Sequence, residues 1–285
     1  MVILAIAAVA VLVAVGAAWA VFSSKANYDS VPYKFKARLF FWLGDIRRIG
    51  SFPWVTWSAN CHEMTLRDTR DASATCRPGD IGLHKDNGFL SNVAIPGAFK
   101  HAWICVDDHM CVEAVSEGVL KRDDMVPLVS DYAIILRPKG VSEWEVREAV
   151  GRANAIVGHE YDANFDFDLK ETDEALFGRR TIGRTVERAM NDAMNNRRLI
   201  SHLTSGKYHF AFSCTEVASF CWYRSREKLG IFRSQHAGRQ SIIADDFLRM
   251  AFDVVYASPS VTEEWAARNG LHEEGRFRIS EYRKA

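Results

Sequence analysis

The segment FSCTEVASFCW holds the residues best suited to nucleophilic chemistry, because a cysteine directly follows a helix-start signal. Ser213 and, three residues later, Glu216 form a capping-box pattern, which predicts that a helix begins at Ser213. Cys214 is then the first helical residue, where free backbone N–H groups and the helix dipole favour a thiolate. The same N–H groups could donate to an oxyanion formed on a substrate carbonyl. The alternative is an inert, buried core cysteine.

A nucleophilic cysteine needs a base, and His101 is the best placed of the nine histidines. It opens a strand expected over 101–107, and a returning strand over 110–115 carries Glu113. If this hairpin closes tightly, the Glu113 carboxylate lies beside His101, orients the ring and favours its charged form. Glu113 could equally be a half-exposed strand residue. The histidines that lack such a setting are expected on the surface or in loops: His84, His109, His159, His202 and His209.

The elements that would position these residues are short strands followed by helices. Strands are expected after the turn in RPGDIGLH, at 101–107, 110–115 and 132–138, and in DVVYAS; helices are expected over 142–157, from 214 to about 229, and over 242–252. Gly158 and Gly230 are the expected stops of the first two helices. Residues 171–205 are polar, basic and helix-prone, and we interpret them as an insertion. This order of elements predicts an α+β fold.

Residues 2–22 are uncharged and almost wholly aliphatic, and as a helix they would span roughly 31 Å, the thickness of a bilayer core. We expect residues 1–24 to be a retained transmembrane anchor that makes the protein a single-pass membrane protein. The alternative is a cleaved signal peptide with Ala18-Trp19-Ala20 as its cleavage site. Lysine and arginine follow the segment but do not precede it, so the positive-inside rule places the remaining chain on the cytoplasmic side.

The composition beyond the anchor is that of an ordinary globular protein. Lys and Arg total 36 residues and Asp and Glu total 36, so no net charge indicates a nucleic-acid partner. The six cysteines form no CxxC pair and no Cys/His array with zinc spacing, so we expect no metal or cofactor and mostly reduced thiols. We divide the remaining chain into a linker and peripheral segment over 25–75, a catalytic domain over 76–260, and a tail over 261–285. The aromatic stretch FFWLGDIRRIGSFPWVTW in the linker could pack on the domain or lie on the membrane surface.

Five motifs occur in one order: RPGDIGLH, IPGAFKHAWICVDDHMCVEAVSEGV, ILRPKG, ANAIVGHEYDANFDF and FSCTEVASF. This series resembles the permuted branch of the NlpC papain-like cysteine hydrolase superfamily, in particular its YiiX-like group. In that branch the strand with the histidine precedes the helix with the cysteine. The likeness covers about 77–229, over half of the chain. The basic insertion 171–205 and Thr215, where serine is common, depart from the family pattern.

The resemblance implies a circularly permuted papain-like fold, in which an antiparallel sheet packs against the helix that bears the nucleophile. It implies Cys214 as nucleophile, His101 as base and Glu113 as the third member of the triad. Gly79 and Asp80 would start the first core strand. Tyr161 corresponds to a tyrosine near the active site, although it could also be a core aromatic.

The activity implied is a thiol hydrolase, of the amidase or peptidase kind, that cleaves an amide, peptide or acyl bond without a cofactor. One alternative is a lipid acyltransferase or thioesterase of the lecithin–retinol acyltransferase type, which a membrane anchor would suit. Another is a non-catalytic, membrane-tethered binding module that retains the fold.

Overall fold

The computed structural model divides the chain into two units, and the larger one contains the expected catalytic residues. This unit comprises Leu43–Gly178 and Phe210–Ala285, and the other comprises Met1–Trp42 and Arg179–His209. The structure describes residues 34–35, 37–39, 41–42, 46–48, 55–57, 63–93, 95–162, 211–236 and 239–271. Among these residues no helix has the length and apolar character needed to cross a membrane. The expected anchor and the insertion 171–205 lie outside them.

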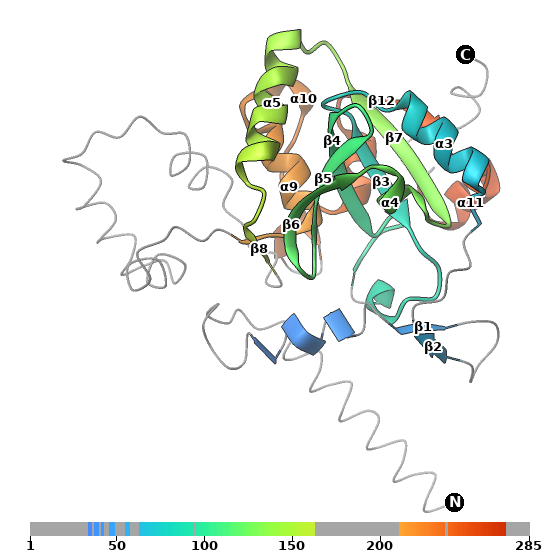
Figure 1. Ribbon diagram of the computed structural model, residues 1–285. Helices are drawn as coiled ribbons and strands as arrows, with labels where there is room; N and C mark the ends of the chain where they lie inside the picture. Colours follow the sequence, from blue (N-terminus) through green and yellow to red (C-terminus); the bar gives the residue numbers. More distant parts are fainter. Residues whose placement is uncertain are drawn as a thin grey trace, which may run out of the picture. The chain divides into compact units, whose positions relative to one another are not determined.

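The centre of the larger unit is a six-stranded antiparallel sheet with the strand order β12-β7-β3-β4-β5-β6 (Figure 1). Its strands are β3 (Ile81–Lys85), β4 (His101–Asp107), β5 (Met110–Val115), β6 (Gly118–Asp123), β7 (Tyr132–Pro138) and β12 (Phe252–Ala257). The α+β class is therefore confirmed, and the strands expected at 101–107, 110–115 and 132–138 have the expected bounds. Strand β6, which continues the hairpin, is one that the sequence analysis did not anticipate.

Helices cover both faces of this sheet because its strands are apolar on both sides. On one face, α5 (Glu143–Ala155) and α9 (Cys214–Cys221) pack over a core that includes Leu83 and Ile104. On the other face, α3 (Leu66–Thr75) and α4 (Met125–Leu128) cover a smaller core that includes Trp103. Figure 1 shows α5 and α9 on the opposite side of the sheet from α3.

Shorter elements complete the unit. The two-stranded pairs are β1 (Ile46–Arg48) with β2 (Val55–Trp57), β8 (Glu160–Tyr161) with β9 (Ala211–Phe212), and β10 (Ser234–His236) with β11 (Arg239–Ser241). The 3-10 helices are Leu90–Val93, Tyr223–Ser225 and Ala244–Arg249, and the remaining α-helices are α10 (Arg226–Leu229) and α11 (Glu263–Arg268). The single helix expected over 214–229 is thus three short helices in series, which end at Gly230 with a φ of 70°. The helix expected over 242–252 is a 3-10 turn that leads into β12.

The packed domain extends beyond both expected boundaries, 76 and 260. Helix α3 buries Ala72 in the second core and receives a hydrogen bond from Tyr256 Oη to the Asp68 carbonyl at 3.0 Å. Near the other end, Trp265 on α11 stacks on Tyr132 with ring centroids 4.6 Å apart. Both segments were assigned to a linker or tail because a short helix that buries few apolar residues has only a weak periodic pattern.

A glycine and a tryptophan set the spacing between β3 and β4. Gly82 lies directly opposite Trp103 in the register, and the indole covers the glycine. A Cβ atom at Gly82 would come within 1.9 Å of Trp103 Cε2. Only glycine therefore permits this cross-strand packing, and Trp103 is completely buried.

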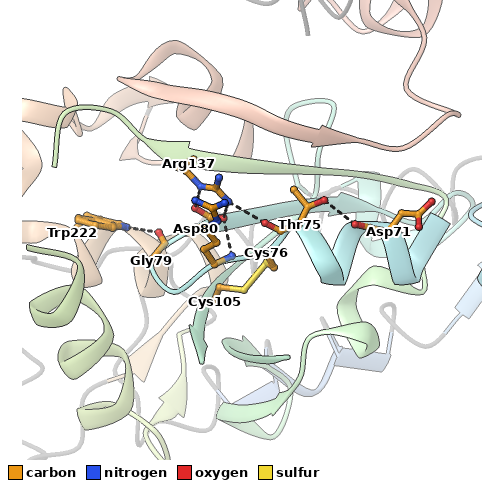
Figure 2. Close-up of polar contacts among 9 residues, drawn as sticks. Asp71, Thr75, Cys76, Gly79, Asp80, Cys105, Arg137 and Trp222 are labelled. Atoms are coloured by element: carbon orange, nitrogen blue, oxygen red, sulfur yellow. Dashed lines mark hydrogen bonds and ion pairs between the residues drawn. A yellow bond between two sulfur atoms is a disulfide. The ribbon is translucent and has the colours of Figure 1, made fainter. Parts of the chain in front are cut away.

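The turn that leads into β3 is held by a buried ion pair (Figure 2). Asp80, which is 1% exposed, receives two hydrogen bonds from the Arg137 guanidinium, at 3.0 Å to Oδ1 and 2.7 Å to Oδ2. Trp222 Nε1 donates to the Gly79 carbonyl at 3.1 Å, and Gly79 has a φ of 91°. The first core strand starts at Ile81, so Gly79 and Asp80 form the turn immediately before it.

Candidate active site

Cys214 is the first residue of α9, as the capping-box pattern predicts. The Glu216 carboxylate accepts a hydrogen bond from the Ser213 N–H at 2.7 Å, and the Ser213 carbonyl accepts from the Val217 N–H at 3.0 Å. These contacts fix the start of the helix directly before Cys214, which is 5% exposed. The cysteine therefore lies at the positive end of the helix dipole, where a thiolate is favoured.

His101 and Glu113 face each other across the β4–β5 hairpin, which confirms the predicted contact. His101 Nε2 lies 2.7 Å from Glu113 Oε2, and the side chains are 19% and 3% exposed. The register explains this contact, since Glu113 pairs with Trp103, the residue two positions after His101. An ionised carboxylate can only accept hydrogen bonds, so Nε2 carries the proton in this pair. The other ring nitrogen, Nδ1, is left for a second partner.

That second partner is Cys214. Burial of the ring lowers the pKa of His101, but the charge of the Cys214 thiolate and its hydrogen bond, followed by those of Glu113, outweigh this effect and raise the pKa to about 10. Helix α9 contacts β4 and β5, the two strands that carry His101 and Glu113. Cys214, His101 and Glu113, which are distant in sequence, thus form one connected group in the order thiol, imidazole, carboxylate.

Arg122 is a fourth member of this group that the sequence analysis missed. Its Nε lies 3.0 Å from Glu113 Oε1, so Arg122 and His101 bind opposite oxygens of one carboxylate. Burial raises the pKa of Glu113, but the hydrogen bond and charge of His101, and then the charges of His84 and Arg122, outweigh burial and lower it. Arg122 lies on β6, and because that strand was not anticipated, no pattern assigned its side chain to the site.

The expectation that His84 is a surface or loop residue is wrong. His84 lies on β3 directly opposite His101 in the register, and the two ring centroids are 4.7 Å apart. The motif IGLHK is too short for its alternation to indicate which face of the sheet His84 lies on. His109, by contrast, lies in the exposed hairpin turn with a φ of 58°.

Tyr161 lies on β8, whose parallel partner β9 leads into the helix of Cys214. Tyr161 pairs with Phe212, and the Asp162 N–H donates to the Phe212 carbonyl at 3.1 Å. Tyr161 is partly buried against the main core. The structure therefore places Tyr161 opposite Phe212, which lies two residues before Cys214 in the sequence.

The remaining described cysteines differ from Cys214 in their surroundings. Cys111 and Cys221 are free and buried, and burial raises the pKa of both thiols. Cys76 and Cys105 form a disulfide, a pair that their spacing of 29 residues did not reveal. The expectation of reduced thiols is therefore wrong for this pair, whereas Cys111, Cys214 and Cys221 are free.

We compared the chain with models of protein families, with curated proteins and with solved structures, and none of the three comparisons found a match. The function must therefore be inferred from the site itself. The site offers a thiol at a helix N-terminus, an imidazole in contact with it, and a buried carboxylate that holds the imidazole. This is the arrangement that nucleophilic acyl transfer requires.

Proposed function

We propose that this protein is a thiol hydrolase of the permuted papain-like type, which cleaves an amide, peptide or acyl bond through Cys214, His101 and Glu113. The observation that carries the proposal is the position of the His101 ring between the Glu113 carboxylate and the Cys214 thiol. The pKa of His101, raised to about 10, means that the imidazolium keeps its proton at neutral pH beside the sulfur of Cys214.

The reaction follows from this pair. The Cys214 thiolate attacks the substrate carbonyl carbon, and backbone N–H groups at the start of α9 stabilise the oxyanion. The bond to the leaving group breaks, and that group takes a proton from His101 Nδ1. Water then attacks the thioester carbonyl while His101 accepts one of its protons, the bond to sulfur breaks, the carboxylic acid leaves, and the Cys214 thiolate is regenerated. Glu113 keeps the proton on Nε2 throughout, so that Nδ1 is the nitrogen that exchanges protons with thiol, leaving group and water.

The order of elements supports the permuted form of the fold, since the strand with His101 precedes the helix with Cys214. Tyr161 is a substrate-contacting residue in this proposal, because its strand runs beside the segment that enters α9. The proposal includes a single-pass membrane anchor over residues 2–22 and a cytoplasmic catalytic domain, both of which derive from the sequence.

The test is site-selective acylation of the full chain with an activated ester, p-nitrophenyl acetate, followed by mass spectrometry of the acylated peptide. We expect a thioester on Cys214 and a burst of p-nitrophenolate. Cys214→Ser and His101→Ala should each reduce turnover by roughly 10³-fold or more, because the proposed nucleophile and base act in the same step and neither works without the other.

Cys221→Ala is the matched control, since this thiol lies two turns further along the same helix and is only 2% exposed. It should retain acylation and turnover. Equal, slow acylation of Cys111, Cys214 and Cys221, with no effect of His101→Ala, would show that the thiols are inert and that the fold serves only for binding.

A further inference from the structure

Two sulfur atoms and a carboxylate converge on the face of the sheet that carries α3 and α4. Cys76 caps the C-terminal end of α3, Cys105 lies on β4, and Asp124 immediately follows β6. One ligand atom from each of the three residues lies within 4.8 Å of the other two. The two sulfurs form a disulfide, which Figure 2 shows next to the Asp80–Arg137 pair.

The Asp124 carboxylate is the observation that a disulfide alone does not explain. Asp124 has no exposed surface. Its Oδ1 accepts a hydrogen bond from Ser73 Oγ at 2.7 Å, but Oδ2 is buried and has no hydrogen-bond partner among the described residues. A neutral disulfide provides neither a positive charge nor a hydrogen for this oxygen. Burial of a carboxylate oxygen without a positive charge or a hydrogen-bond donor beside it destabilises the folded state.

We propose that the reduced form of this pair binds a zinc ion through Cys76 Sγ, Cys105 Sγ and Asp124 Oδ2, with water in the fourth position. Thiolate and carboxylate are ligands that Zn²⁺ accepts, with bonds of about 2.3 Å to sulfur and about 2.0–2.2 Å to oxygen. Ligand atoms around such an ion are roughly 3.3–3.8 Å apart, a separation that fits within the observed 4.8 Å. The ion would neutralise Asp124 Oδ2.

A hydrogen-bonded chain orients the carboxylate for this role. Ser73 Oγ lies 2.8 Å from His109 Nδ1 and donates to Asp124 Oδ1 at 2.7 Å. Oδ1 is thereby held, which leaves the buried Oδ2 as the oxygen available to the ion. Polar groups that orient a metal ligand in this way are common around protein metal sites. They also account for the buried Ser73, which is 4% exposed.

The two forms are connected by a balanced exchange. A dithiol reductant donates two electrons and two protons to the Cys76–Cys105 bond, which breaks to two thiols, and the reductant becomes a cyclic disulfide. Zn²⁺ then replaces the two thiol protons, which are released. A reducing cytoplasm maintains the thiol form, and an oxidising compartment maintains the disulfide. Either linkage ties α3 to β4, the strand that begins at His101.

The experiment uses the full chain with Cys214→Ala, so that the active-site thiol does not contribute to the metal signal. The protein is reduced, freed of reductant without oxygen, and titrated with Co²⁺ as a spectroscopic substitute for Zn²⁺. We expect one Co²⁺ per chain, thiolate-to-cobalt charge-transfer absorption and displacement by Zn²⁺. Asp124→Asn should weaken binding by about tenfold or more, since it replaces a charged ligand by a neutral amide. Asp123→Asn, an exposed neighbour, should leave the affinity unchanged.

A second measurement does not depend on cysteine variants that fail to fold. Zn²⁺ should slow alkylation of Cys76 and Cys105 in the reduced protein, as mapped by mass spectrometry, and Asp124→Asn should need about tenfold more Zn²⁺ or above for the same protection. The disulfide form should bind no Co²⁺ through sulfur. The inference is overturned if the reduced chain shows no charge-transfer band, or if Asp124→Asn and Asp123→Asn bind Co²⁺ equally well.

Discussion

The most informative perturbation of the proposed active site is Glu113→Gln, because it keeps the shape of the side chain and removes its charge. Glu113 accepts a hydrogen bond from His101 at 2.7 Å and contacts Arg122 at 3.0 Å. The amide can offer its oxygen to only one of these partners. If the oxygen faces Arg122, the NH₂ group faces His101 Nε2, which must then lose its proton to accept a hydrogen bond. The variant therefore favours the other tautomer of the His101 ring, in which Nε2 carries no proton.

The size of the effect follows from the pKa of His101. A rise from 6.5 to about 10 corresponds to on the order of 5 kcal/mol in favour of the imidazolium. Cys214 contributes more of this than Glu113 does. The loss of a hydrogen bond between charged groups costs about 1.5–3 kcal/mol, which is roughly one to two pKa units. We therefore expect the pKa of His101 to fall by that amount in Glu113→Gln and further in Cys214→Ala.

The assay is an NMR titration of isotope-labelled histidine, which needs no substrate. The His101 resonance should titrate at successively lower pH in the wild type, in Glu113→Gln and in Cys214→Ala. Glu117→Gln is the matched control, since Glu117 is an exposed residue beyond the same strand. Turnover of the activated ester should fall by about 10- to 100-fold in Glu113→Gln. If His101 still titrates near 10 in both variants, neither the thiolate nor the carboxylate is the cause of its raised pKa, and the proposed triad fails.

Two further predictions concern the framework, and each is measured by urea unfolding against a control variant in the same chain. Arg137→Met should destabilise the domain by about 3 kcal/mol because it leaves the buried Asp80 carboxylate unpaired. Lys139→Met is the control: it removes an exposed ion pair with Asp253 and should change the free energy of unfolding by less than about 0.5 kcal/mol. Equal losses of stability in Arg137→Met and Lys139→Met would show that burial of Asp80 does not make its ion pair more important. Gly82→Ala should cost about 3 kcal/mol or more through its clash with Trp103. Gly151→Ala on α5 is the control: its Cβ atom would meet no other atom within 4 Å, and it should stabilise the domain by about 0.5–1 kcal/mol. If Gly82→Ala is as stable as the wild type, the Trp103 indole can move and the predicted clash is wrong.

The sheet could be predicted from the sequence wherever a strand is long and flanked by turns. Strands β4, β5 and β7 each have six or seven residues and match their expected bounds. Strand β6 follows β5 after two residues, and its sequence GVLKRD has polar residues in its second half, which hide the pattern. Helix α3 was missed because it buries only Thr69, Ala72 and Ser73, none of them large. Tertiary packing, rather than a local hydrophobic pattern, determines that β6 and α3 form.

Some residues of the candidate site could be predicted from the local sequence, whereas others are placed there only by the tertiary structure. The start of α9 is encoded within four residues, so the capping box located Cys214 correctly. The His101–Glu113 contact depends on one hairpin, whose register follows from its tight turn. Arg122 and His84 reach the site from β6 and β3, the outer neighbours of that hairpin. Their positions depend on strand order and register across four strands, which no local pattern of a single sequence reveals.

The cysteines show most clearly why residue type alone does not determine chemistry in this protein. Cys111 and Cys221 are buried, and burial raises the pKa of each thiol and suppresses its reactivity. Cys76 and Cys105 meet each other beside a buried carboxylate, which suits a covalent or metal-mediated link. Cys214 is also buried, yet it begins a helix and interacts with an imidazole held by Glu113. The helix terminus and the imidazole, rather than exposure, therefore distinguish the proposed nucleophile from the structural cysteines.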